Sequence, residues 1–117
     1  MNIEHETFFK MLADRTRMRA LMLMQSEDEL CVCELTHALK LSQPKISRHL
    51  AQLREAGLVR ARREGLWMYY RINPALPDWA LAILKNSLLG SEQDKTFRQD
   101  HSRLCGMQDR PGAICCA

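Results

Sequence analysis

Hydrophobic side chains recur at intervals of three and four residues over most of this chain, a spacing that predicts amphipathic helices. The pattern is clearest over residues 43–56, which form an apolar stripe and an opposite polar face. Ser42 is a favoured N-cap residue, Pro44 is tolerated in a first helical turn, and Gly57 favours a helix end. The whole pattern predicts helices over residues 7–13, 14–25, 31–39 and 43–56, and a last one from Pro77 or Asp78 to about Leu89.

Two runs with high β-propensity follow the fourth predicted helix. Residues 59–63 and 66–72 are rich in β-branched, aromatic or alternating side chains, and Glu64-Gly65 between them favours a tight turn. The acidic residues 27–29 are expected to form a loop. Two helices joined by a short connection and followed by a hairpin predict a winged helix-turn-helix, with element order α-α-α-α-β-β-α. The fold class is therefore mainly α with a β-hairpin wing.

Length and composition fit one compact unit. The chain has 117 residues, and residues 1–90 are expected to form the winged helix-turn-helix, which both binds DNA and dimerises. Residues 91–117 are expected to be a polar, cysteine-containing extension, in which a helix to about Leu104 is an open alternative and the end from Gly106 is mobile. No run is long and apolar enough for a membrane span, and the N-terminus does not resemble a signal peptide, so a cytoplasmic location is expected.

Basic side chains are concentrated in the predicted helix-turn-helix and hairpin. Residues 42–72 carry seven basic and two acidic side chains, although the net charge of the whole chain is only +3. Such a segment attracts a polyanion, the alternative being an ordinary solvated face. The second helix of a helix-turn-helix places its N-terminal residues towards base edges in the major groove. The expected base contacts are therefore Gln43, Lys45 and Ser47, and the expected phosphate or minor-groove contacts are Arg48, His49, Arg62 and Arg63.

His49 has a second interpretation, because a single histidine on a helix is often a structural hydrogen-bonding residue. The methionines of the second predicted helix are interpreted as core packing and not as a ligand set.

A Cys-x-Cys pair, Cys31 and Cys33, lies at the start of the first helix of the predicted helix-turn-helix. The chain has five cysteines, an odd number that indicates thiols and not a framework of disulfides. Thiolates bind soft ions, but residues i and i+2 of a regular helix do not face each other, so this turn would have to be distorted. The alternative is two small buried cysteines. A ligand that favours one conformation of this turn could control the DNA-reading helix.

Two thiolates leave a trivalent ion short of a third sulfur. The next helical turn offers Thr36 and His37, so Cys105, Cys115 or Cys116 would have to supply a third thiolate, or none does. We find no phosphate-binding glycine loop, no zinc-protease motif and no Cys-x-x-Cys, which argues against an enzyme. A redox-sensing repressor and a metal-binding chaperone without a DNA role are further alternatives.

Three motifs resemble the arsenic-responsive ArsR/SmtB family of winged-helix repressors, and they are most similar to its arsenical-operon repressors. The resemblance covers residues 8–89, and its motifs are Leu-Ala-Asp-Arg-Thr-Arg (12–17), Glu-Leu-Cys-Val-Cys-Glu-Leu (29–35) and Ser-Gln-Pro-Lys-Ile-Ser-Arg-His-Leu (42–50). It implies a homodimer formed by the first and last helices and bound to double-stranded operator DNA. It also implies release when trivalent arsenic or antimony binds Cys31 and Cys33, without an organic cofactor.

The chain departs from the pattern of the arsenical repressors in one place, and it lacks the ligand residues of two other branches of the family. Thr36 stands where the arsenical repressors have a third cysteine. The cadmium and lead sensors add N-terminal cysteines, and residues 1–30 contain none. The zinc and nickel sensors use histidines of the last helix, and residues 78–89 contain none. Cadmium or lead sensing by the same fold is kept as an alternative function.

Overall fold

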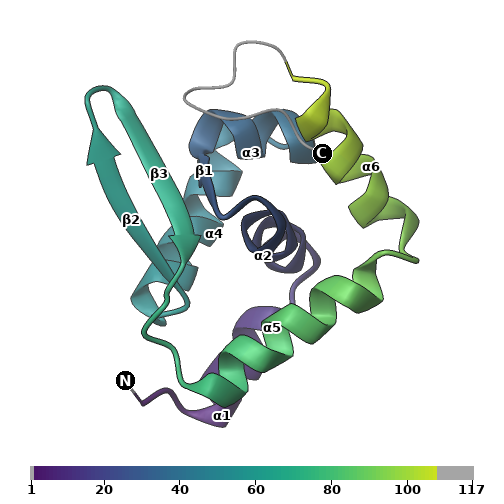
Figure 1. The fold of residues 1–117 in the computed structure, drawn as a ribbon. Helices are drawn as coiled ribbons and strands as arrows, with labels where there is room; N and C mark the ends of the chain where they lie inside the picture. The colour runs from purple at the N-terminus through teal and green to yellow at the C-terminus, as the bar shows by residue number, and fades with distance from the viewer. Residues whose placement is uncertain (1, 108–117) are drawn as a thin grey trace.

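A computed structural model describes residues 2–107 of the chain (Figure 1). Its elements, in order, are α1 (His5–Leu12), α2 (Arg15–Glu27), β1 (Glu29–Cys31), α3 (Val32–Leu39), α4 (Gln43–Glu55), β2 (Val59–Glu64), β3 (Trp67–Ile72), α5 (Asp78–Ser91) and α6 (Lys95–Cys105). Among the described residues, no helix is both long enough and apolar enough to cross a membrane.

Helix α2 is the centre of the fold. Figure 1 shows it surrounded by α1 and α5 on one side, by α3 and α4 on another, and by α6 and the hairpin at the flanks. Five consecutive α2 residues, 20–24, are buried, so this helix has no solvent face at its middle. Met22 and Met24 are among them, which confirms the interpretation of these methionines as core packing.

The cap residues of α4 agree with the sequence analysis. The Ser42 hydroxyl accepts a hydrogen bond from the Lys45 amide, and Pro44 lies in the first turn of α4. Gly57 follows the end of α4 with φ of 89°, a left-handed conformation that glycine adopts without steric cost. Lys40 takes the left-handed conformation at the end of α3, with φ of 55°, and so turns the chain towards α4.

The sheet differs from the predicted hairpin by one strand. Residues 29–31, of which 29 was assigned to a loop and 31 to a helix, form strand β1 and pair antiparallel with β3, so the strand order is β1-β3-β2. The prediction was wrong here because a three-residue strand is too short to show an alternating pattern. Leu30 is fully buried at its centre and fixes the strand against the core.

The region after residue 90 is also more structured than a polar extension. Helix α5 continues to Ser91, and α6 then packs against α2 and α3. Leu104 of α6 is fully buried in the same core as α2. Residue 90, the predicted boundary, therefore lies inside the last turn of α5. Of the segment expected to be mobile, residues 108–117 lie outside the described residues.

Candidate DNA-binding and thiol sites

Helix α4 presents the expected base-reading residues on its outer face. Ile46, Leu50 and Leu53 are buried against the core, which turns the opposite face of the helix outward. Gln43 and Arg48 are exposed, and Lys45 and Ser47 are partly exposed. The Gln43 amide donates a hydrogen bond to the Ser47 hydroxyl (3.3 Å), so these two side chains lie together near the N-terminal end of α4.

His49 does not share this face. Its side chain is buried at the inner side of α4, and its Nδ1 atom lies 3.9 Å from a carboxylate oxygen of Asp14. Among the described residues, Nδ1 has no hydrogen-bond partner. The phosphate contact expected of His49 therefore does not fit its position. The alternative of a structural residue agrees with its burial, but the hydrogen bond expected of it is not made at Nδ1. Sequence periodicity could not decide this, because position 49 borders the apolar stripe.

Asp14 is the N-cap residue of α2. Its carboxylate accepts a hydrogen bond from the Arg17 amide at 3.0 Å, and this bond, more than the nearby His49 and Arg17 charges, lowers the pKa of Asp14 below its ordinary value.

The two arginines expected to contact DNA from the wing have different surroundings. The Arg62 guanidinium donates to both carboxylate oxygens of Glu29 (2.7 to 3.2 Å) and to Glu64 (2.7 Å). It also lies over the Tyr69 ring, 4.7 Å from its centre. The hydrogen bonds to Glu29 and then to Glu64 raise the pKa of Arg62, and the same pair lowers the pKa of Glu29.

Arg63 is exposed, and its side chain lies on the opposite face of β2 because successive strand residues alternate. Its Nε donates one long hydrogen bond, 3.4 Å, to the Gly65 carbonyl. Arg63 is thus available to a phosphate, while the charge of Arg62 is balanced within the protein. Sequence analysis missed the role of Glu29, since its partner is 33 positions away along the chain.

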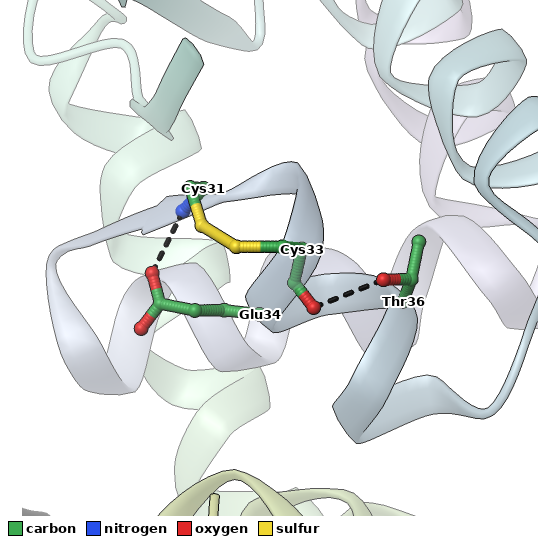
Figure 2. Close-up of a disulfide and its surroundings, with 4 residues drawn as sticks. All are labelled: Cys31, Cys33, Glu34 and Thr36. Atoms are coloured by element: carbon green, nitrogen blue, oxygen red, sulfur yellow. Dashed lines mark hydrogen bonds between the residues drawn. A yellow bond between two sulfur atoms is a disulfide. The ribbon is translucent and has the colours of Figure 1, made fainter. Parts of the chain in front are cut away.

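The cysteine pair lies where β1 ends and α3 begins, and Figure 2 shows a disulfide between Cys31 and Cys33. The expectation of free thiols is therefore wrong for this structure. The premise that both cysteines lie on a helical turn is also wrong, because Cys31 is the extended N-cap residue (φ −86°, ψ 164°) and not a helical one. From this position its side chain turns towards Cys33 in the first turn of α3, with a Cα–Cα distance of 5.5 Å.

Two hydrogen bonds organise the start of α3 (Figure 2). The carboxylate of Glu34, itself buried, accepts from the Cys31 amide at 2.9 Å. The Thr36 hydroxyl donates to the Cys33 carbonyl at 2.9 Å, which places position 36 one turn beyond Cys33. Glu34 was not singled out from the sequence, although its spacing from Cys31 matches that of a capping box, in which a carboxylate at N3 reaches back to the N-cap amide.

A third ligand does not accompany the cysteine pair within residues 2–107. This part of the chain holds no group of three or more histidine, cysteine or acidic side chains suited to a metal ion. Cys105 lies at the end of α6, with its sulfur 3.9 Å from the ring nitrogens of His101. Cys115 and Cys116 lie outside the described residues.

Comparison with known proteins agrees with the geometry of the helix-turn-helix. Residues 14–61 match the family described as "Bacterial regulatory protein, arsR family". The arsenic resistance transcriptional regulator ArsR1 of Pseudomonas putida is 54% identical over 110 residues, which cover 93% of this chain and 84% of that protein. The arsenical resistance operon repressor of Escherichia coli is 54% identical over 76 residues, which cover 65% of each chain.

A solved structure shows the same architecture. The homodimeric winged helix-turn-helix DNA-binding domain Mb0332 of Mycobacterium bovis matches with a TM-score of 0.62 and 28% identity, over 74% of this chain and 77% of that one. The predicted winged helix-turn-helix is confirmed by this fold, and the family model and the relatives identify a regulator and not an enzyme. The chain belongs to the arsR family of bacterial regulatory proteins.

Proposed function

We propose that this protein is a homodimeric repressor of an arsenic-resistance operon. It binds double-stranded operator DNA and leaves it when trivalent arsenic or antimony binds to Cys31 and Cys33. The observation that carries the proposal is the place of the cysteine pair, at the first turn of the eight-residue helix α3. The opposite end of α3 leads through Lys40 directly into the reading helix α4. The relatives from Pseudomonas putida and Escherichia coli are named as arsenic regulators, which supports this inducer class.

The DNA contacts follow from exposure and charge. In the proposed complex Gln43, Lys45 and Ser47 read base edges, and Arg48 and Arg63 contact phosphates. The homodimer is supported by an apolar surface on the first and fifth helices. Phe9 of α1 is 47% exposed and Leu89 of α5 is 60% exposed, although both are large and hydrophobic. The two helices already lie together, since the His5 and Trp79 rings stack with centroids 4.4 Å apart.

The inducer requires the reduced form of the pair, because a disulfide offers no thiolate. The short distance between the two residues allows both sulfurs to reach one soft ion without unwinding α3. An ion bound to both sulfurs would favour its own geometry at the β1–α3 junction, where the Glu34 carboxylate now accepts a hydrogen bond from the Cys31 amide. A ligand can shift the protein towards release only if it binds that conformation better. The third donor is either a thiolate of Cys105, Cys115 or Cys116, or none.

The direct experiment is fluorescence anisotropy of the reduced protein on the DNA upstream of its own gene. Arsenite, antimonite, cadmium and zinc are titrated into the complex of the wild type, Cys31→Ser, Cys33→Ser and a variant with serine at Cys105, Cys115 and Cys116. We expect arsenite and antimonite to release the wild type, while Cys31→Ser and Cys33→Ser bind DNA normally and stay bound. Normal release of both single variants would contradict the proposed site. Release by cadmium but not arsenite would move the function to the cadmium-sensing alternative.

The disulfide favours a second candidate, a thiol redox-sensing repressor. In this alternative, oxidation of Cys31 and Cys33 would itself change the β1–α3 junction and release DNA. Anisotropy after treatment with diamide and then with dithiothreitol tests it, with mass spectrometry to detect the loss of two hydrogens. Release by diamide in the absence of arsenite, reversed by dithiothreitol and abolished in Cys33→Ser, would favour redox sensing.

A further inference from the structure

A buried ion cluster joins the last helix to the core. Asp100 of α6 is fully buried, and its carboxylate accepts two hydrogen bonds from Arg19 of α2, both at 2.7 Å, and one from Arg103 at 2.7 Å. A buried carboxylate is costly unless it is paired in this way. The bonds to Asp100 raise the pKa of Arg19 above its ordinary value. Nothing in the proposed inducer or DNA contacts uses these three residues.

Both arginines of the cluster also donate hydrogen bonds to carbonyl groups at the end of α3. Arg19 donates to the Leu39 carbonyl at 2.9 Å, and Arg103 donates to the Ala38 carbonyl at 2.7 Å. The last carbonyls of a helix have no partner within the helix, so other donors must satisfy them. The two guanidinium groups therefore cap α3 from outside, and Asp100 holds both in place.

The capped end is the turn of the helix-turn-helix. Lys40, directly after Leu39, is the left-handed residue that reverses the chain, and Ser42 begins the reading helix two residues later. The orientation of α4 relative to α2 depends on this short connection. A bidentate guanidinium–carboxylate pair is a geometrically demanding contact, because both groups are planar. The cluster thus fixes the direction in which α3 ends.

A second contact of α6 provides a useful contrast. Arg15 and Asp94 form an ion pair at 3.0 Å, but their side chains are 57% and 33% exposed, and no bond joins this pair to α3. Exposed pairs of this kind contribute little to stability. Only the buried cluster links α6 to the helix-turn-helix turn within the described residues by side-chain hydrogen bonds to backbone carbonyls.

We propose that Arg19, Asp100 and Arg103 are positioning residues for DNA reading, through which α6 sets the orientation of α4. Helix α6 is then a working part of the DNA-binding unit and not an appended extension. The inference rests on the proposed DNA binding. It distinguishes contacts that depend on the orientation of α4, which are the base contacts, from phosphate contacts, which tolerate a small rotation.

The test compares Asp100→Asn and Arg103→Gln with Arg98→Gln in the full chain. Asp100→Asn leaves two mostly buried guanidinium groups without a counter-charge, so Arg103→Gln is included because it keeps the Arg19–Asp100 pair. Arg98→Gln is the matched control, since Arg98 is an exposed arginine of the same helix and the substitution removes the same charge. Circular dichroism and thermal unfolding establish that each variant is folded at the assay temperature.

Two readouts separate positioning from stability. The first is the ratio of the affinity for operator DNA to the affinity for a scrambled duplex of the same length, both measured at the same salt concentration. We expect Arg103→Gln to lower this ratio by about tenfold, roughly 1.4 kcal/mol, while Arg98→Gln leaves it unchanged. The second is the amide NMR shifts of Lys40, Leu41 and Ser42 in the protein without DNA, which should move in Arg103→Gln and Asp100→Asn only.

An unchanged ratio together with unmoved turn amides in folded Arg103→Gln would overturn the proposal. Equal losses in Arg103→Gln and Arg98→Gln would also overturn it, because charge alone would then explain the effect. If the wild type itself shows no preference for the upstream DNA, the proposed function fails. The amide shifts still test the cluster in that case, since they do not require DNA.

Discussion

The neighbouring wing residues Arg62 and Arg63 carry the same charge, but the structure predicts different effects on DNA binding. Arg62 is bound by Glu29 and Glu64, so replacing it removes mainly an ion-pair network within the protein. Arg63 is exposed on the other face of β2 with one long hydrogen bond to a backbone carbonyl. Arg63→Ala should therefore remove a phosphate contact that Arg62→Ala largely leaves in place.

The size of the effect follows from the release of counterions. Each phosphate contact contributes about 0.9 to the slope of log affinity against log salt on duplex DNA. A homodimer has two wings, so Arg63→Ala should reduce the magnitude of this slope by about 1.8. Over a fourfold rise in salt, from about 50 to about 200 mM, the wild type would then lose about twelvefold more affinity than the variant. For Arg62→Ala we expect less than about half of this change in slope.

The assay is anisotropy on one fluorescent operator duplex at five or more salt concentrations, with both alanine variants and the wild type measured side by side. Circular dichroism is needed as a control, because Arg62→Ala also leaves Glu29 without its main partner. Equal changes of slope in the two variants would show that the ion pairs of Arg62 open when DNA binds. If Arg63→Ala keeps the wild-type slope of log affinity against log salt, the wing residue Arg63 does not contact a phosphate.

Three further predictions concern His49, Asp14 and Thr36. Because its ring is buried, His49→Ala should lower the free energy of unfolding by roughly 1–3 kcal/mol, measured by urea denaturation. The slope of log DNA affinity against log salt should stay unchanged, and a smaller slope would support a phosphate contact of His49. Asp14→Ala should cost about 1 kcal/mol at neutral pH through loss of the α2 cap. The pKa of Asp14 is lowered in the folded state, so the stabilisation by its carboxylate is complete above the ordinary value of 3.8 and is lost as the pH falls through the pKa of the folded state. The difference in unfolding free energy between the wild type and Asp14→Ala should therefore shrink in acid. Thr36→Cys would add a thiol one turn beyond Cys33, and release should then need less arsenite; an unchanged titration midpoint would show that position 36 does not reach the ligand.

The sequence predicted correctly those elements whose ends are marked by cap and turn residues. Ser42, Pro44 and Gly57 mark the bounds of α4, and the structure agrees because caps and left-handed glycines act within one turn. Strand β1 was missed because its pairing with β3 joins segments 40 residues apart, which no local pattern reports. Helix α6 was left open, although Asp94 gives a cap signal by accepting hydrogen bonds from the Thr96 and Phe97 amides.

Some features of the candidate site could likewise be predicted from the sequence, and others could not. Exposure of Gln43 and Arg48 follows from helical periodicity, and the cysteine pair is visible in the sequence itself. The disulfide arrangement depends on Cys31 ending a strand, and the balanced charge of Arg62 depends on a distant carboxylate. Such facts arise from tertiary pairing and could not be read from spacing.

The three-stranded sheet has a consequence for how sharply the protein could respond to its inducer. Cys31 pairs with Tyr69 on β3, and Tyr69 pairs in turn with Arg62 on β2, so one row of residues crosses from the cysteine pair to the wing. The same cysteine pair also begins α3, which leads to the reading helix. A displacement at this junction would therefore reach both surfaces that we propose to face DNA. Since free energies add while binding constants multiply, two modest losses occurring together would lower operator occupancy far more than either alone.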